Sequence, residues 1–168
     1  MKHFKKITIA LLLFAATTGF VNAQKIAHID VQELLSQMPE MKAAQAELQK
    51  LGETYKADIE SSVTELKNKY NQYSNEAATK SKEENDKRAA ELQGYEKNIG
   101  DAQQTAQQEL QKKQQELMGP ITEKAKAAIE KVAAADGIDY VIDASPGGGL
   151  IVAKGKDLLP QVKKELGF

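Results

Sequence analysis

The stretch between Pro39 and Pro120 constrains the fold most, because it contains no other proline and carries apolar residues at helical spacing. Apolar or small residues recur there every three or four positions, which keeps one narrow stripe on one face of a helix. The stripe consists of Met41, Ala44, Leu48, Leu51, Tyr55, Ile59, Val63, Leu66, Tyr70, Tyr73 and Ala77, and then of Leu92, Tyr95, Ile99, Ala102, Ala106, Leu110 and Leu117. The pattern predicts a long antiparallel coiled-coil hairpin over residues 39–120.

The turn of this hairpin is predicted from a helix start signal. Ser81-Lys-Glu-Glu84 has the form of a capping box, in which a hydroxyl caps the helix and a carboxylate follows three residues later. The second helix is therefore expected to begin at Ser81, with the tip at residues 78–80. This tip lies midway between Pro39 and Pro120, so the two prolines are expected side by side at the base of the hairpin. Each arm of about 40 residues should be roughly 60 Å long.

Two further features of the hairpin sequence bear on its shape. Gly119-Pro120 is expected to kink or restart the returning helix, because proline lacks the backbone N–H that a helix interior needs. Gly52, Gly94 and Gly100 each cost about 1 kcal/mol relative to alanine inside a helix. They are either tolerated substitutions or points at which the arms bend, and the sequence leaves both interpretations open.

The first 23 residues have the pattern of an export signal. Three lysines at positions 2, 5 and 6 precede the short apolar segment 7–16, and Val21-Asn-Ala23 places small residues where a signal peptidase cleaves. The apolar segment is too short to span a bilayer. We therefore expect cleavage after Ala23, no transmembrane segment in the mature chain, and a periplasmic location.

Composition narrows the classes of function. Loss of the three N-terminal lysines leaves 20 basic and 24 acidic residues, a formal charge of −4, which argues against nucleic acid as a partner. The chain has no cysteine, and His28 is the single histidine left after cleavage. A lone histidine in a strand does not make a metal site, which needs three or four convergent ligands. Neither a metal, a cofactor nor an enzyme active site is expected.

The remaining residues, 24–38 and 121–168, predict a small α/β body. Its expected elements are a strand at 25–30, a short helix at 31–38 with Leu34 and Leu35 facing inward, a continuing helix to Asp136, strands at 138–143 and 150–154, and a last helix capped by Asp157. The turn Ser145-Pro-Gly-Gly-Gly149 is expected to join the last two strands into a β-hairpin. No Walker lysine follows these glycines, so they are not read as a phosphate loop.

The predicted fold class is therefore α+β and mostly α, with one long helical hairpin projecting from a small β-rich body. A body of this size is marginal as an independent globule, and its few short strands leave open edges. Assembly of several copies through those edges is the simplest remedy.

These elements occur in an order that resembles a known family. The export signal is followed by Lys25-Ile-Ala-His-Ile-Asp30, by Leu34-Leu35 with Pro39-Glu40, and by the long hairpin; the chain closes with Gly137-Ile-Asp-Tyr-Val-Ile-Asp143 and the 157–166 segment. The sequence resembles the Skp/OmpH family of periplasmic chaperones over essentially the whole mature chain. The resemblance implies a homotrimer in which three helical arms surround a cavity. It also implies ATP-independent binding of unfolded outer-membrane proteins, which are kept from aggregating.

The charge of this chain differs from that of well-known family members. Well-known members are strongly basic, whereas this mature chain is net acidic, so binding to lipopolysaccharide or anionic membranes is not inferred. Six apolar or aromatic residues are the candidates for contact with a client protein: Ile59, Val63, Tyr70, Tyr73, Tyr95 and Ile99. The competing interpretation is that all six belong to the seam between the two helices. An alternative function for the whole chain is a structural spacer or adhesive protein of the cell envelope.

Overall fold

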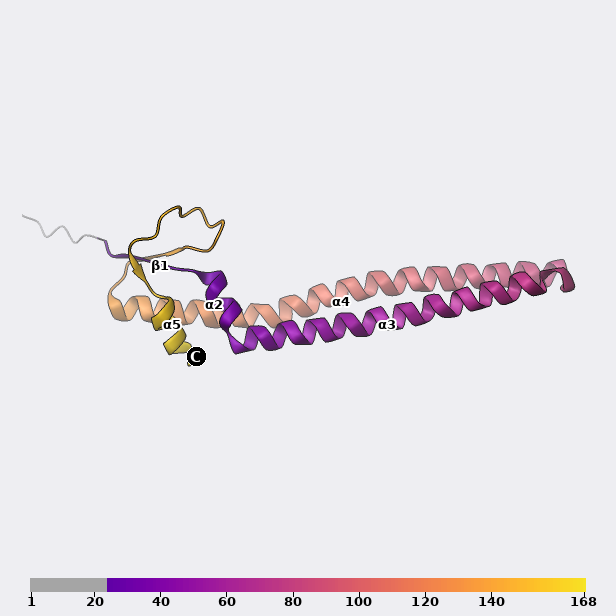
Figure 1. Cartoon of the computed structure of the whole chain (residues 1–168), viewed down its shortest axis with the longest axis horizontal. Coiled ribbons are helices and arrows are strands. Elements are labelled where there is room, and N and C mark those ends of the chain that lie inside the picture. Colours follow the sequence, from indigo (N-terminus) through magenta and orange to yellow (C-terminus); the bar gives the residue numbers. More distant parts are fainter. Residues whose placement is uncertain (1–23) are drawn as a thin grey trace, which may run out of the picture.

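The computed structural model describes residues 24–168, so the expected signal peptide at 1–23 lies outside the described residues. The elements are β1 (Ile26–Ile29), α2 (Val31–Gln37), α3 (Pro39–Glu76), the 3₁₀ turn η1 (Ala77–Thr79), α4 (Lys82–Asp136), β2 (Tyr140–Asp143), β3 (Lys156–Asp157) and α5 (Leu159–Leu166). Figure 1 shows a small body from which α3 and α4 project as one long arm. The predicted α+β, mostly α fold class is confirmed. No helix within residues 24–168 is long and apolar enough to cross a membrane.

The hairpin turns where the capping signal predicted. α3 begins with Pro39 in its first turn, where a missing N–H costs nothing, and η1 closes the tip. Ser81 is the N-cap of α4, and its Oγ accepts a hydrogen bond from the Glu84 backbone N–H at 3.2 Å. Asn85 Nδ2 donates to the carbonyl of Ala77 at 3.0 Å, which ties the start of α4 to the turn. The sequence prediction of the tip is therefore confirmed.

Of the expected kink or restart of the returning helix at Pro120, the restart is wrong, and the kink stays a prediction. α4 continues through Pro120 as one helix of 55 residues. The proline ring is on the exposed side, while the next residue, Ile121, and then Ala125 are buried against the body. Burial of this apolar face stabilises the helix on the far side of Pro120, because tertiary packing contributes more to helix stability than local propensity does.

The core of the body lies between the sheet and the last turns of α4. The α4 face is rich in alanine, which allows the helix to approach the sheet closely, and Ala125 is 1% exposed. The α2 and α5 helices close the core from the sides. The largest completely buried side chains are Ile29, Leu34, Met38, Leu158 and Val162. They come from both ends of the chain, so the body forms only when the hairpin brings those ends together.

The sheet is parallel throughout, which corrects one sequence prediction. Its order is β2-β1-β3, with β1 in the centre. Ile26 pairs with Tyr140, and His28 pairs with both Ile142 and Asp157. The predicted β-hairpin between residues 138–143 and 150–154 is wrong: 150–154 is not a strand, and the next strand, β3, pairs with β1 instead of β2.

A polar cluster at the end of β2 explains why no tight hairpin forms there. Asp143 Oδ1 accepts from the Val31 backbone N–H at 3.3 Å, and Ser145 Oγ accepts from the Gln32 backbone N–H at 3.0 Å. Ser145 Oγ also lies 3.1 Å from Asp30 Oδ1. These contacts attach the residues after β2 to the N-terminus of α2, so the chain leaves the sheet edge and returns on the other side of β1.

Candidate functional site on the helical hairpin

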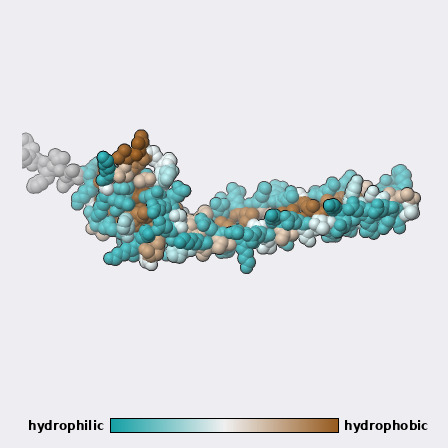
Figure 2. Space-filling model, in the orientation of Figure 1, coloured by the Kyte–Doolittle hydropathy of each residue, from teal (hydrophilic) through white to brown (hydrophobic). Residues whose placement is uncertain are grey.

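The hairpin divides the six candidate residues into two groups. Four of them are half-buried along the contact between α3 and α4, as the coiled-coil interpretation predicts: Ile59, Tyr73, Tyr95 and Ile99. The other two are exposed, Val63 by 45% and Tyr70 by 62%. Figure 2 shows the apolar side chains of the arm as a narrow stripe flanked by polar surface. Of the six candidates, only Val63 and Tyr70 are therefore exposed outside the seam.

The exposure of these two residues follows from helical geometry. A step of four residues advances a side chain by about 40° beyond one full turn, since a helix has 3.6 residues per turn. Leu51, Tyr55, Ile59 and Val63 are separated by three such steps, so Val63 has rotated toward the edge of the seam. The next step, to Leu66, spans three residues and returns the stripe to the seam. Tyr70 again follows after four residues and lies outside it.

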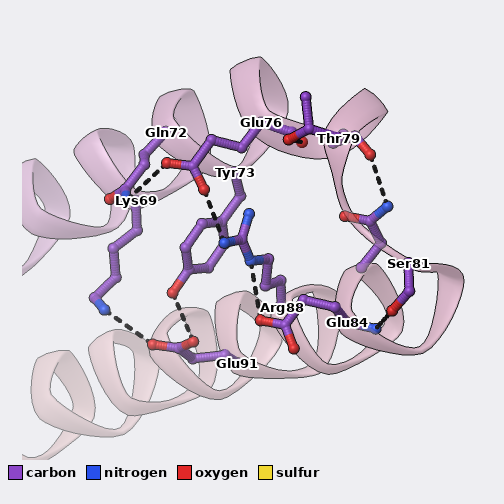
Figure 3. Close-up of polar contacts among 11 residues, drawn as sticks. Lys69, Gln72, Tyr73, Glu76, Thr79, Ser81, Glu84, Arg88 and Glu91 are labelled. Carbon is purple, nitrogen blue, oxygen red and sulfur yellow. Dashed lines mark hydrogen bonds and ion pairs between the residues drawn. The ribbon is translucent and has the colours of Figure 1, made fainter.

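The distal part of the arm is held by polar contacts as well as by the seam (Figure 3). Tyr73 and Lys69 of α3 both donate to Glu91 of α4, the hydroxyl at 2.7 Å and Lys69 Nζ at 2.9 Å. Arg88 Nη2 donates to Glu76 at 2.8 Å, and its guanidinium lies 4.6 Å from the centre of the Tyr73 ring. We call these five residues the distal clasp.

The hydrogen bonds of the clasp lower the pKa values of its carboxyl groups and raise that of its tyrosine. The hydrogen bond from Tyr73, followed by that from Lys69, lowers the pKa of Glu91, and acceptance by Glu91 raises the pKa of the Tyr73 hydroxyl. Hydrogen bonds from Gln72 and then Arg88 lower the pKa of Glu76. Both carboxyl groups are therefore ionised at neutral pH, as the contacts with Lys69 and Arg88 require.

Sequence reasoning did not identify these cross-arm contacts. Tyr73 and Tyr95 were predicted as apolar candidates, but each hydroxyl is a donor across the seam, Tyr95 to Glu65 at 3.1 Å. Tyr55 makes the same kind of contact with Glu109. The signal in the sequence is a glutamate on one helix opposite a tyrosine on the other. Such a pair can be recognised only when the register of the two arms is known.

Two grooves lie along the middle of the arm. A groove of about 430 Å³ lies along one flank, between residues 52–60 of α3 and 103–110 of α4. A smaller groove of about 270 Å³ runs past Asp58 and Ser62 and shares Tyr55 and Ile59 with the first. Small residues such as Ala106 in the contact between the helices leave this space.

Within residues 24–168 no group of three or more histidine, aspartate or glutamate side chains could hold a metal ion. The arm therefore offers an extended surface of apolar, uncharged polar and paired charged side chains.

Comparison with known proteins identifies the family. The sequence profile of the family described as "Outer membrane protein (OmpH-like)" matches residues 25–166, which is most of the chain. The chain belongs to the OmpH-like family. Relatives named "Chaperone protein Skp" are 23% identical in Pectobacterium atrosepticum and 24% identical in Photorhabdus luminescens, each over 92% of this chain and 93% of the relative.

The fold of the chain is also that of a solved OmpH-like structure. The crystal structure of an outer membrane chaperone (OmpH-like) from Caulobacter crescentus superposes with a TM-score of 0.76, covering 89% of this chain and 87% of that protein. The identity is 17%, so this likeness concerns the fold. The resemblance stated from the sequence is confirmed at the level of the family.

Proposed function

We propose that this protein is an ATP-independent holdase chaperone of the periplasm. It binds unfolded outer-membrane proteins between helical arms and prevents their aggregation. A chaperone rather than an enzyme agrees with the names of both curated relatives. The periplasmic location rests on the N-terminal export pattern in residues 1–23.

The observation that carries the proposal is the shape of the chain: a long, capped arm with open grooves along its flanks, attached to a body with an uncovered apolar surface. The 38 residues of α3 correspond to about 57 Å of helix. Several such arms around one body would enclose a space large enough for an unfolded chain. A client with exposed apolar strands needs this kind of enclosure, because its open strands aggregate with one another.

The body supports assembly into a homotrimer. One face of the sheet exposes Ile26 and its partner Tyr140 by 53% and 54%, and Ile142 lies on the same face, 41% exposed. The loop after β2 adds Ile151 and Val152, which are 96% and 62% exposed. Figure 2 shows an apolar patch above the body. Monomers rarely expose such groups together, so we infer that other copies of the chain cover them.

The client-binding test uses aggregation of an outer-membrane β-barrel protein diluted from urea, followed by light scattering without ATP. We expect suppression at about one assembly per client. Replacing the two exposed arm residues, Val63→Ser with Tyr70→Ser, should weaken it, whereas Ala43→Ser on an exposed turn near the body should not. Undiminished aggregation at excess wild-type protein would contradict the proposal and favour the spacer alternative.

The assembly test measures molar mass in solution by light scattering coupled to gel filtration. The wild-type chain is expected at three times the monomer mass. Ile151→Asp places a charge in the inferred interface and should lower the mass, while Lys154→Asp changes an exposed polar residue of the same loop. A wild-type monomer at micromolar concentration would refute the trimer.

A further inference from the structure

The groove on the flank of the arm has a floor and a rim of different chemistry. Tyr55 and Ile59 of α3 and Ala106 and Leu110 of α4 form an apolar floor, in which Ala106 is 7% exposed. The rim on the α3 side carries Lys56 and Glu60, whose charges compensate one another. The groove therefore selects for apolar side chains and has no preference for a charged ligand.

Gly52 keeps one end of this groove open. A glycine in a helix interior costs about 1 kcal/mol relative to alanine, so its presence calls for a reason. A Cβ atom added at Gly52 would meet nothing within 4 Å, so close packing does not require the glycine. Gly94 has equally free surroundings but does not line the groove. At Gly52, the absence of a side chain has the effect of leaving the groove accessible.

The opposite rim is formed by uncharged amides. Gln103 and Gln107 line the groove, and Gln111 continues the same row toward the body. All three are exposed, and their side-chain amides make no hydrogen bond to another group within residues 24–168. Each glutamine amide offers two donor hydrogens and one acceptor oxygen, the same types of group that a peptide backbone needs.

The spacing of this row matches an extended polypeptide. Residues four apart in a helix are separated by about 6 Å along the axis. In an extended strand, backbone groups that face the same side repeat every two residues, about 6.6 Å apart. Two successive glutamines can therefore reach successive peptide groups of a strand lying in the groove, while alternate side chains of that strand point to the apolar floor.

We propose that this groove is a binding site for an extended segment of unfolded polypeptide with apolar residues at alternate positions. Strands of outer-membrane β-barrels have this alternation. The floor takes the apolar side chains, and Gln103 and Gln107 exchange hydrogen bonds with the backbone, so binding does not depend on the identity of the intervening residues. The inference rests on the proposed holdase function and adds a client site to the exposed residues Val63 and Tyr70.

The first test fills the groove without disturbing the helix. Gly52→Leu adds a side chain where there is space and is compared with Gly94→Leu, which makes the same change outside the groove. Binding of a urea-unfolded outer-membrane β-barrel protein is followed by the tryptophan fluorescence of that protein, because the chaperone chain contains no tryptophan. We expect Gly52→Leu to raise Kd about tenfold, which corresponds to about 1.4 kcal/mol. Gly94→Leu should bind like the wild type.

The second test addresses the amide row. Gln107→Glu removes the donor groups at the rim, and Gln108→Glu makes the same charge change at the neighbouring exposed residue, which does not line the groove. Weaker client binding by Gln107→Glu alone is the expected result. Equal binding by both variants would overturn the assignment of the glutamine rim.

The possible results distinguish a failure of the groove assignment from a failure of the proposed holdase function. Failure of the wild-type chain to bind the client would overturn both the function and the site. Wild-type binding with equal Kd values for Gly52→Leu and Gly94→Leu would overturn the groove and leave the holdase function intact. A lower molar mass of Gly52→Leu in gel filtration would also overturn the inference, because the groove would then be a contact between copies.

Discussion

Leu34 and Leu35 are neighbours in α2 that differ in burial. Substituting each in turn measures how much the body core contributes to the free energy of unfolding, with Leu35 as the control. Leu34 is completely buried, whereas its neighbour Leu35 is half-buried against the same core. Replacing a buried leucine by alanine costs about 2–5 kcal/mol, because apolar contact is lost and a cavity remains. Leu34→Ala should lie in the upper half of that range. Leu35→Ala loses only part of the transfer energy, so a cost of about 1 kcal/mol is expected.

Both substitutions change helix propensity in α2 by the same amount, so the difference between them reports burial. We expect this difference to be about 2.5–4 kcal/mol, a large fraction of the 5–15 kcal/mol that stabilises a typical domain. Urea unfolding followed by circular dichroism gives the free energies of unfolding. Hydrogen exchange at the amides of β1 and β2 shows whether the body opens while the distal arm stays helical. Equal destabilisation by the two substitutions would refute the account of the core.

Three further predictions concern the hairpin. The pKa values of Glu76 and Glu91 are lowered, so their contribution to stability is complete above the unfolded value of about 4.3 and is lost as pH falls through the lower folded values. Hydrogen-exchange protection factors at the tip, which correct for the pH dependence of intrinsic amide exchange, should therefore fall below about pH 4; unchanged protection factors at pH 2 would contradict this. Gly94→Ala and Gly100→Ala should each raise the free energy of unfolding by about 1 kcal/mol, because an added Cβ meets nothing within 4 Å; destabilisation in urea melts would reveal a contact with another copy. Ser81→Ala removes the N-cap of α4 and should lower the free energy of unfolding by about 1 kcal/mol, as measured by the same melts. Ser81→Asp should keep most of the stabilisation by the cap, because aspartate also accepts a hydrogen bond at this position.

The six candidate residues show what the spacing of apolar residues cannot predict on its own, namely which of them face the partner helix. The sequence places all six on one stripe, and four of them do lie in the seam. Whether Val63 and Tyr70 face the partner helix depends on a rotation of about 40° at each four-residue step. The hydrogen bonds of Tyr73 and Tyr95 depend in turn on which α4 residues face them. That register follows from the packing of the two helices and from the position of the turn together.

The sequence by itself determined the long hairpin, its tip and its mostly helical class. These features arise from interactions between residues a few positions apart: apolar spacing, the Ser81 cap and the absence of proline between Pro39 and Pro120. The tertiary structure alone decided the parallel sheet, the continuation of α4 through Pro120 and the exposed loop around Ile151. In these cases the deciding partners are far apart in the chain, as with β1 and β2, which are separated by the whole arm. Local propensity cannot choose between such pairings, because their stabilisation appears only when both ends of the chain meet.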